Sequence, residues 1–404
     1  MRLRSPRLAA VALLATLALL TPTSPAVAAI ARPAQVGLVS FTGASLTSTG
    51  ATLTVDWPDA AGAAGYEVFA ARSLDAVAAA TTPAVRVTDS RATVSRLTAG
   101  VDYFVQVRAV NSVGVGPRSS RVGHGTIASQ GTFPAGAPSY RALTWNVCSN
   151  ACAGITTRAK VINRRITEIA PDIVALQEAS KYTTAPTGYR FVANGQNDIL
   201  VRSGQFAVVP MKTAATAGST VFARKSATPG KGIAWAALRH RTGAYVVVFD
   251  AHLVSGTTAA QVAQRTYEAE RLNAFVLSTL GKLAASYGSL TNWKNAPVII
   301  LGDFNTHKSR VGDGTQAVLQ KAGWYDAYDQ ARSLMAQHHN SANPTMQTAP
   351  VIGVRWGDHV DKVLVRPSRT AVIRWANAGK RVGGTYVAPL GSDHHPVLAV
   401  VSVR

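Results

Sequence analysis

The sequence has few cysteines, few acidic residues and few long apolar runs, and these shortages limit the kinds of protein it can encode. Cys148 and Cys152 are the only cysteines among 404 residues, which excludes a site built on four cysteine thiolates. After the N-terminal segment, no apolar run is long and uncharged enough to span a bilayer. Lys and Arg number 41 against 20 Asp and Glu, a net charge of +21, so the chain as a whole attracts anions.

The N-terminal segment has the pattern of a secretory signal peptide. Residues 2–7 contain three arginines, residues 8–20 are apolar, and residues 26–28 are Ala-Val-Ala, small residues at the spacing of a cleavage site. A membrane anchor is the alternative, and the shortness of the apolar run disfavours it. We therefore expect residues 1–28 to be removed and the mature protein to be secreted and extracellular. Nothing in the sequence implies a stable protein partner.

The two cysteines are separated by three residues, directly after a predicted strand. In a secreted protein this spacing predicts a disulfide between Cys148 and Cys152 that closes a small loop. Two free thiols, or half of a metal site, are the alternatives.

The basic excess is concentrated in the C-terminal part of the chain. Residues 30–126 hold eight basic and six acidic residues, a net charge of +2, whereas residues 127–404 hold 30 and 14, a net charge of +16. A field of this sign concentrates polyanions such as DNA, RNA, anionic lipid or cell-surface polymers. Solubility of a secreted protein is the alternative explanation of the same charge.

The segment from residue 31 to residue 126 has the features of a small β-sandwich. Tyr103 follows Leu97 at the spacing of a tyrosine corner, in which the phenol bonds to the nearby backbone. With Trp57, this segment resembles a fibronectin type III domain, which implies an all-β sandwich without catalytic residues. Side chains alternate between apolar and polar as in strands over residues 51–57, 65–70 and 103–110.

The pattern changes after this segment. Residues 127–139 are rich in Gly, Pro, Ala and Ser and predict an interdomain linker. From residue 140 onward apolar strands alternate with longer helical patterns, which predicts an α/β sandwich built on two sheets. In the first of these helices Ile162 lies on the apolar face, and we place Arg158 off that face. We expect helices over 157–170 and 259–285, and buried strands over 173–176, 245–249, 298–301, 360–365 and 397–403.

Polar residues stand at the ends of these apolar strands. Singly, each is ordinary turn or core chemistry. Together they supply hard oxygen ligands for a divalent cation and groups that transfer protons near neutral pH. The set comprises Asn146, Glu178, His252, Asp303, Asn305, Asp361, Asp393 and His394.

These residues, in this order, resemble the motifs of the DNase I-like endonuclease/exonuclease/phosphatase superfamily. The most specific are the boxes Gly302-Asp303-Phe304-Asn305 and Ser392-Asp393-His394-x-Pro396, and the resemblance spans residues 141–404 nearly completely. It implies a DNase I-like four-layer α/β sandwich. It also implies hydrolysis of phosphoric ester bonds with Mg²⁺, or Mn²⁺ or Ca²⁺, as cofactor.

The resemblance also implies a role for each residue. DNase I has one further glutamate that pairs with the first histidine, and the corresponding region of this chain offers only Asp198. The superfamily pattern leaves open which histidine is the acid and which binds phosphate. Asn146, Glu178 and Asp393 would hold the metal, Asp303 and Asn305 would orient or activate water, Asp361 and His394 would form a carboxylate–imidazole pair, and His252 would contact phosphate or protonate the leaving group.

The site residues leave the substrate open, because the superfamily includes nucleases, sphingomyelinases and inositol-polyphosphate phosphatases. Residues 360–363 lack the Cys-Asp-Arg-Ile type of box of the inositol phosphatases, and Trp293 and Trp324 are too scattered for the aromatic hairpin of a secreted sphingomyelinase. The charge of +16 over residues 127–404 favours nucleic acid as substrate, contacted mainly through phosphates. A phospholipid phosphodiesterase and a non-catalytic surface-binding protein are the alternatives.

Overall fold

The computed structural model describes residues 31–129, 136–225, 230–352 and 359–404. The predicted signal peptide, residues 1–28, lies outside the described residues. Within the described ranges, no helix combines the length and the apolar character needed to cross a membrane.

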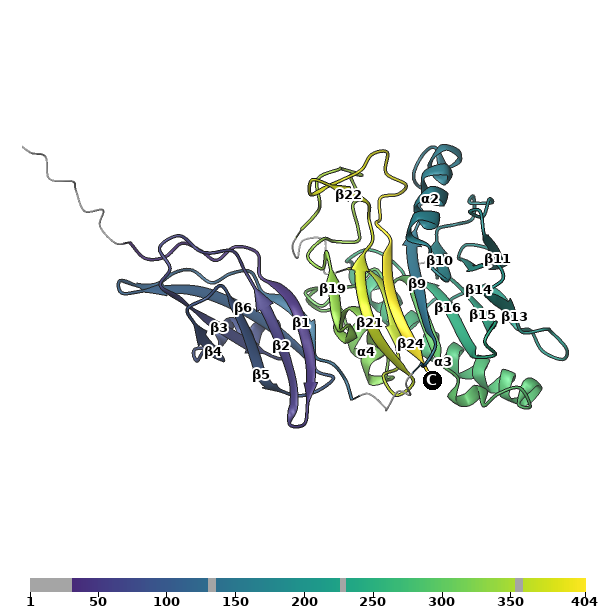
Figure 1. Ribbon diagram of the computed structural model, residues 1–404, viewed down its shortest axis with the longest axis horizontal. Coiled ribbons are helices and arrows are strands. Elements are labelled where there is room, and N and C mark those ends of the chain that lie inside the picture. Colours follow the sequence, from purple (N-terminus) through teal and green to yellow (C-terminus); the bar gives the residue numbers. More distant parts are fainter. Residues whose placement is uncertain (1–30, 130–135, 226–229, 353–358) are drawn as a thin grey trace, which may run out of the picture. The chain divides into compact units, whose positions relative to one another are not determined.

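The N-terminal domain is a sandwich of antiparallel strands, as its resemblance to a fibronectin type III domain predicts (Figure 1). Trp57 is buried in its core. The hydroxyl of Tyr103 accepts a hydrogen bond of 3.1 Å from the backbone N–H of Thr98, which confirms the tyrosine corner. One sheet contains β1 (Ser40–Thr47), β2 (Gly50–Asp56) and β5 (Arg91–Leu97), and the other contains β3 (Gly65–Ala71), β4 (Val85–Val87), β6 (Asp102–Asn111), β7 (Gly114–Val115) and β8 (Val122–Gly125), with the short helix α1 (Leu74–Ala79) between β3 and β4.

The C-terminal domain is built on two sheets of seven strands each (Figure 1). The β9 sheet has the strand order β11 (Tyr189–Ala193), β12 (Asp198–Arg202), β10 (Ile173–Gln177), β9 (Ser139–Asn146), β24 (Val397–Val403), β21 (Thr370–Asn377) and β19 (Ser333–Met335). The β16 sheet has the order β13 (Phe206–Val208), β15 (Gly232–His240), β16 (Tyr245–His252), β17 (Val298–Asp303), β20 (Asp361–Val365) and β18 (Tyr325–Asp326), and β14 (Ala217–Val221) also pairs with β15.

Helices cover the outer faces of both sheets. α2 (Ile155–Ile169) packs on the β9 sheet, and α3 (Ala259–Tyr287) packs on the β16 sheet together with α4 (Thr315–Lys321). The inner faces pack against each other, because alternate residues of a strand point to opposite sides. The four-layer sandwich is thereby confirmed. The remaining elements are η1 (Trp293–Asn295), α5 (Ala327–Gln330) and the hairpin of β22 (Arg381–Val382) and β23 (Thr385–Tyr386).

The two predicted helices begin and end within two residues of their expected bounds. α3 starts with a capping box, in which Thr258 and Gln261 satisfy each other's backbone N–H groups. α2 ends before Pro171, which cannot continue a helix. The placement of Arg158 off the apolar face of α2 is wrong. It lies one helical turn before Ile162, on the same face, and only 8% of it is exposed.

Gly302 allows the central strands β16 and β17 to approach each other. These strands pair in parallel, with Ala251 opposite Gly302. Gly302 has a φ of 158°, and a Cβ atom there would stand 1.8 Å from the backbone oxygen of Ala251. No side chain can move to relieve that overlap, so the strand itself would have to shift.

We therefore expect Gly302→Ala to lower the free energy of unfolding by at least about 2 kcal/mol, as overpacked cores do. Gly281→Ala in α3 is the matched control, because its Cβ would have no neighbour within 4 Å. The control should stabilise the protein by about 0.5–1 kcal/mol, the usual gain of alanine over glycine in a helix. Urea denaturation of both variants measures the difference, and a Gly302→Ala protein as stable as wild type would contradict this role of the glycine.

Candidate active site

Three of the predicted residues lie side by side on adjacent strands of the β16 sheet. In the parallel pairing of β16 with β17, His252 stands opposite Asp303. In the antiparallel pairing of β17 with β20, Asp303 stands opposite Asp361. All three are almost completely buried. Strand register alone therefore brings together residues that are far apart in the sequence.

The β9 sheet contributes Asn146 and Glu178 from the ends of two neighbouring parallel strands. Asn146 pairs with Gln177 at the ends of β9 and β10, and Glu178 follows directly. The amide nitrogen of Asn146 lies 3.3 Å from Oε1 of Glu178 and 3.0 Å from Oδ2 of Asp303. Glu178 has a φ of 52°, a left-handed conformation that is strained for a residue with a side chain and is frequent at functional sites.

One carboxylate oxygen of Asp303 is the point on which the site converges. Besides the amide of Asn146, its Oδ2 lies 3.6 Å from Nε2 of His252 and 3.9 Å from Nε2 of His394. The other oxygen, Oδ1, accepts a hydrogen bond of 2.9 Å from the backbone N–H of Asn305. Asp303 is therefore held in one orientation, with two imidazoles facing it.

Asp361 and His394 form the carboxylate–imidazole pair that the motifs predict. Nδ1 of His394 lies 2.8 Å from Oδ2 of Asp361. Burial by itself lowers the pKa of His394, but the charge and hydrogen bond of Asp361, with smaller contributions from Asp303 and Asp393, outweigh it and raise this pKa to about 10. His394 is thus an imidazolium at neutral pH, and its Nε2 donates toward the site.

His252, in contrast to His394, is uncharged at neutral pH. Burial lowers its pKa to about 4, although the charge of Asp303 acts the other way. The amide nitrogen of Asn305 lies 3.2 Å from its Nε2, and an amide N–H can only donate, so Nε2 of His252 accepts and Nδ1 carries the proton. Among the described residues, that buried Nδ1 has no hydrogen-bond partner.

The acidic partner that DNase I has for its first histidine has no counterpart at Asp198. The carboxylate of Asp198 accepts a hydrogen bond of 2.9 Å from the backbone N–H of Gly195. Burial raises the pKa of Asp198 to about 7. Asp198, the first residue of β12, therefore holds the turn that precedes this strand, and His252 is neutral instead of paired.

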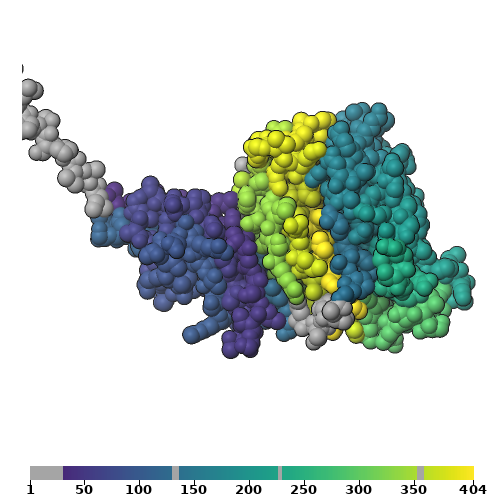
Figure 2. Space-filling model, viewed as in Figure 1, coloured from purple at the N-terminus to yellow at the C-terminus, as the bar shows by residue number. Residues whose placement is uncertain are grey.

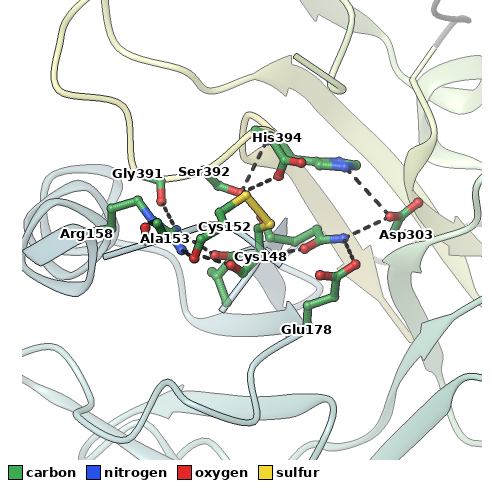
Figure 3. The surroundings of a disulfide bond; sticks show 12 residues. Cys148, Cys152, Ala153, Arg158, Glu178, Asp303, Gly391, Ser392 and His394 are labelled. Carbon is green, nitrogen blue, oxygen red and sulfur yellow. Dashed lines mark hydrogen bonds and ion pairs between the residues drawn. A yellow bond between two sulfur atoms is a disulfide. The ribbon is translucent and has the colours of Figure 1, made fainter. Parts of the chain in front are cut away.

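Asp393 lies next to the disulfide. Cys148 and Cys152 are joined by a disulfide (Figure 3), and a carboxylate oxygen of Asp393 lies within 4.8 Å of both sulfur atoms. Because both sulfurs are bonded to each other, neither is a thiolate ligand. The hydroxyl of Ser392 donates to the carbonyl of Asn146 at 2.6 Å and lies 3.1 Å from Oδ1 of Asp393.

The donor chemistry of the site fits a hard divalent cation. Carboxylate oxygens of Asp303 and Asp361 lie within 4.8 Å of each other, and Glu178 presents a partly exposed carboxylate beside them. His394, as an imidazolium, has no lone pair for a metal. Oδ1 of Asp361 is buried without a hydrogen-bond partner among the described residues. Carboxylate oxygens are the ligands that Mg²⁺, Mn²⁺ and Ca²⁺ prefer. The amide oxygen of Asn146 instead accepts from the backbone N–H of Cys148 at 2.9 Å, so as placed its nitrogen faces the carboxylates.

The sequence analysis did not predict the buried hydrogen bonds that join the two sheets near the site. Nε2 of Gln177 lies 2.7 Å from Oδ1 of Asp250 and 3.0 Å from the hydroxyl of Thr144. Burial raises the pKa of Asp250 well above its ordinary value. A carboxylate in the middle of the apolar strand β16 was the signal that could have revealed this connection.

A second group that was not predicted, the pair of Arg265 and Asp313, holds the loops after His252 and Asn305. Arg265 of α3 is fully buried and donates to the carbonyls of Val254 and Gly256 at 2.8 and 2.9 Å. It also pairs with Asp313 at 2.8 Å, and the hydroxyl of Thr306 donates to the same carboxylate at 2.7 Å. The helix α3 thereby fixes the segments that directly follow His252 and Asn305.

The arrangement agrees with comparisons to known proteins. The model of the Endonuclease/Exonuclease/phosphatase family matches residues 143–394, and that of the fibronectin type III domain matches residues 35–124. No curated protein sequence matches the chain.

Solved structures similar to this chain include an endonuclease/exonuclease/phosphatase family protein from Bacteroides thetaiotaomicron, with 19% identity, coverage of 65% of this chain and 95% of that chain, and a TM-score of 0.48. A mannosyl-6-phosphatase from the same species is similar at 19% identity, 65% and 98% coverage, and a TM-score of 0.47. The human Nocturnin catalytic domain with bound sulfate is similar at 15% identity, 66% and 96% coverage, and a TM-score of 0.41.

The family match spans more than half of the chain and runs from β9 to His394, the last of the residues that converge on Asp303. The chain therefore belongs to the endonuclease/exonuclease/phosphatase family and is a hydrolase of phosphoric ester bonds.

Proposed function

We propose that the protein is a secreted, metal-dependent phosphodiesterase that cleaves nucleic acid through phosphate-dominated contacts. The observation that carries this proposal is the net charge of +16 over residues 127–404. In addition, Arg164, Arg165 and Lys380 line a cavity of about 400 Å³ that His394 also lines, and Glu168 pairs there with Arg165 and Lys380. The net positive charge of this cavity would favour a phosphate-bearing ligand. The signal-peptide pattern of residues 1–28 supports secretion.

The domain boundaries belong to the same proposal. Residues 31–126 would form the fibronectin type III domain, residues 127–139 a linker and residues 140–404 the catalytic domain. The first domain would serve as a spacer or as an adaptor for a surface, since none of the proposed site residues lies in it.

The residues of the site can be assigned to the steps of phosphodiester hydrolysis. A bound divalent cation would polarise the scissile phosphate and offset its developing charge. Glu178 would be its main ligand, with Asp393, while Asn146, whose amide nitrogen lies 3.3 Å from Oε1 of Glu178 and 3.0 Å from Oδ2 of Asp303, would hold these carboxylates in place. Asp303 would orient the attacking water and receive its proton, and Asn305, whose amide nitrogen bonds to the carbonyl of Leu253 at 3.0 Å, would steady that water.

The two histidines are expected to have different roles, because only His394 is charged at neutral pH. His394, held as an imidazolium by Asp361, would donate from Nε2 to a phosphate oxygen or to the leaving group. His252 is neutral at the same pH, so it cannot serve as the acid and would instead accept a hydrogen bond beside Asp303. We therefore propose His394 as the acid, a choice that the motif pattern alone leaves open.

A substrate panel tests the proposed function. Purified mature protein would be incubated with plasmid DNA, RNA and sphingomyelin liposomes in Mg²⁺, and strand cleavage and phosphocholine release would be measured. We expect cleavage of nucleic acid, with a binding constant that falls by several-fold or more between about 50 and 200 mM salt as counterions are released. Phosphocholine release with intact plasmid would favour the phospholipid phosphodiesterase, and binding insensitive to salt would count against nucleic acid.

A further inference from the structure

We propose that Arg158 is a positioning residue that holds the two loops of the metal site in register, and that the Cys148–Cys152 disulfide shapes one of those loops. This inference rests on the proposed metal-dependent function. It concerns a residue of α2 that contacts none of the predicted catalytic groups directly.

The side chain of Arg158 uses every hydrogen-bond donor that it has. A guanidinium carries five N–H groups in a fixed planar arrangement, and Figure 3 shows this one directed at the disulfide loop and at Gly391. All five acceptors are backbone carbonyl oxygens, so these hydrogen bonds depend on the shape of two loops, and the charge of Asp393 acts on the guanidinium as well. They are Ala153 at 2.9 Å from Nε, Val147 at 2.9 Å and Gly391 at 2.7 Å from one terminal nitrogen, and Cys148 at 2.8 Å and Cys152 at 3.0 Å from the other.

These carbonyls belong to two loops that are far apart in the sequence. Four come from the disulfide loop, residues 147–153, which directly follows Asn146 on β9. The fifth, Gly391, precedes the Ser392-Asp393-His394 box. The hydroxyl of Ser392 closes the same junction by donating to the carbonyl of Asn146 at 2.6 Å. β24, which follows that box, lies beside β9 on the face shown in Figure 2.

A continuous chain of hydrogen bonds connects Arg158 to the carboxylates of the site. Arg158 holds the carbonyl of Cys148, and the backbone N–H of Cys148 donates to Oδ1 of Asn146 at 2.9 Å. That bond directs the amide nitrogen of Asn146 toward Glu178 and Asp303, at 3.3 and 3.0 Å. Cys148 has a φ of 47°, a left-handed conformation that a residue with a side chain adopts only when its surroundings hold it there.

The disulfide and the arginine act on the same loop from two sides. The bond between Cys148 and Cys152 closes a loop of five residues, and the carbonyls of both cysteines accept from one terminal nitrogen of Arg158. The disulfide limits the conformations of the loop, and the guanidinium selects the one in which its carbonyls converge. Without either, Asn146 and Asp393 would lose their fixed separation.

The test is the affinity of the metal-free protein for Mn²⁺, measured by isothermal titration calorimetry. We expect Arg158→Gln to weaken the Kd by about 10–100-fold, the usual effect of removing a group that orients metal ligands. Lys160→Gln is the matched control, because it removes the same charge from an exposed position of the same helix. Its Kd should equal that of wild type. Cys148→Ser/Cys152→Ser should weaken the Kd in the same direction as Arg158→Gln.

Thermal melting distinguishes positioning from plain stabilisation. Each variant would be titrated below its own melting temperature, and a purely structural role would lower that temperature while leaving the Kd of the folded protein unchanged. If Arg158→Gln does not fold, the Kd for Mn²⁺ is measured on Arg158→Lys instead. Lysine keeps the charge but has only three donors on one nitrogen. A folded Arg158→Lys protein with the wild-type Kd would overturn the inference. Absence of Mn²⁺ binding in wild type would instead overturn the proposed metal-dependent function.

Discussion

Replacing Asp303 by asparagine is expected to lower kcat/KM for phosphodiester hydrolysis by about 10⁴-fold, the upper end of what one positioned proton-transfer group contributes. Oδ2 of Asp303 is the atom on which the amide of Asn146, at 3.0 Å, and the Nε2 atoms of both histidines, at 3.6 and 3.9 Å, converge. An amide of the same size cannot take a proton from water. Its nitrogen would also face the nitrogen of Asn146 if it occupied the position of Oδ2, placing two donors against each other.

Glu270→Gln is the control for Asp303→Asn. It makes the same change of charge at an exposed position of α3, and its kcat/KM should equal that of wild type. The Asp303→Asn protein should bind nucleic acid at low salt about as well as wild type, so the loss should fall on kcat more than on KM. An Asp303→Asn enzyme that retains more than a tenth of the wild-type kcat/KM would show that Asp303 is not the group that handles the water.

Asp361→Asn should produce the second large effect, a fall of about 10²–10³-fold in kcat/KM near pH 8. In the folded protein Asp361 raises the pKa of His394 to about 10, against about 6.5 in an unfolded chain. The stability that this pair contributes is therefore complete below about pH 6.5 and is lost as the pH rises through the folded value. Without the carboxylate, the imidazolium deprotonates earlier, and the alkaline limb of the pH profile should move down by about 1–3 pH units.

A double variant checks whether Asp361 acts through His394. His394→Ala and Asp361→Asn remove members of one hydrogen-bonded pair, so the double variant should be hardly less active than His394→Ala alone. The profile of kcat/KM against pH, from pH 5 to 10, provides the second readout. Losses that multiply in the double variant, or an alkaline limb that stays in place in Asp361→Asn, would contradict the assignment.

The elements that carry the site were predictable because their sequences are unambiguous. β10, β16, β17, β20 and β24 are apolar runs bounded by polar residues, and a buried strand needs little more than that to be recognised. The polar residues after them form ordered motifs, so the grouping of His252, Asp303 and Asp361 follows once the strands are placed side by side.

The hydrogen bonds that support the site were less predictable, because they join segments that are distant in the sequence. The partner of Arg158 on the second loop, Gly391, is 233 residues away, and its acceptor is a backbone carbonyl, which every residue possesses. The spacing of Arg158 from Ile162 does carry the signal of a buried face, but an arginine there is ordinarily interpreted as exposed. The charge states of His252 and His394 were likewise hidden, since burial and the carboxylate of Asp361 decide them.

Phosphodiester cleavage by this protein should depend strictly on a bound divalent cation. Wild-type protein would be stripped with EDTA, dialysed, and assayed for plasmid nicking before and after addition of Mg²⁺ or Mn²⁺, with Asp303→Asn treated in parallel. We expect no nicking by the stripped protein, restored nicking when the cation is added to wild type, and none when it is added to Asp303→Asn. Nicking by stripped wild type at the rate of the metal-loaded enzyme would contradict this dependence.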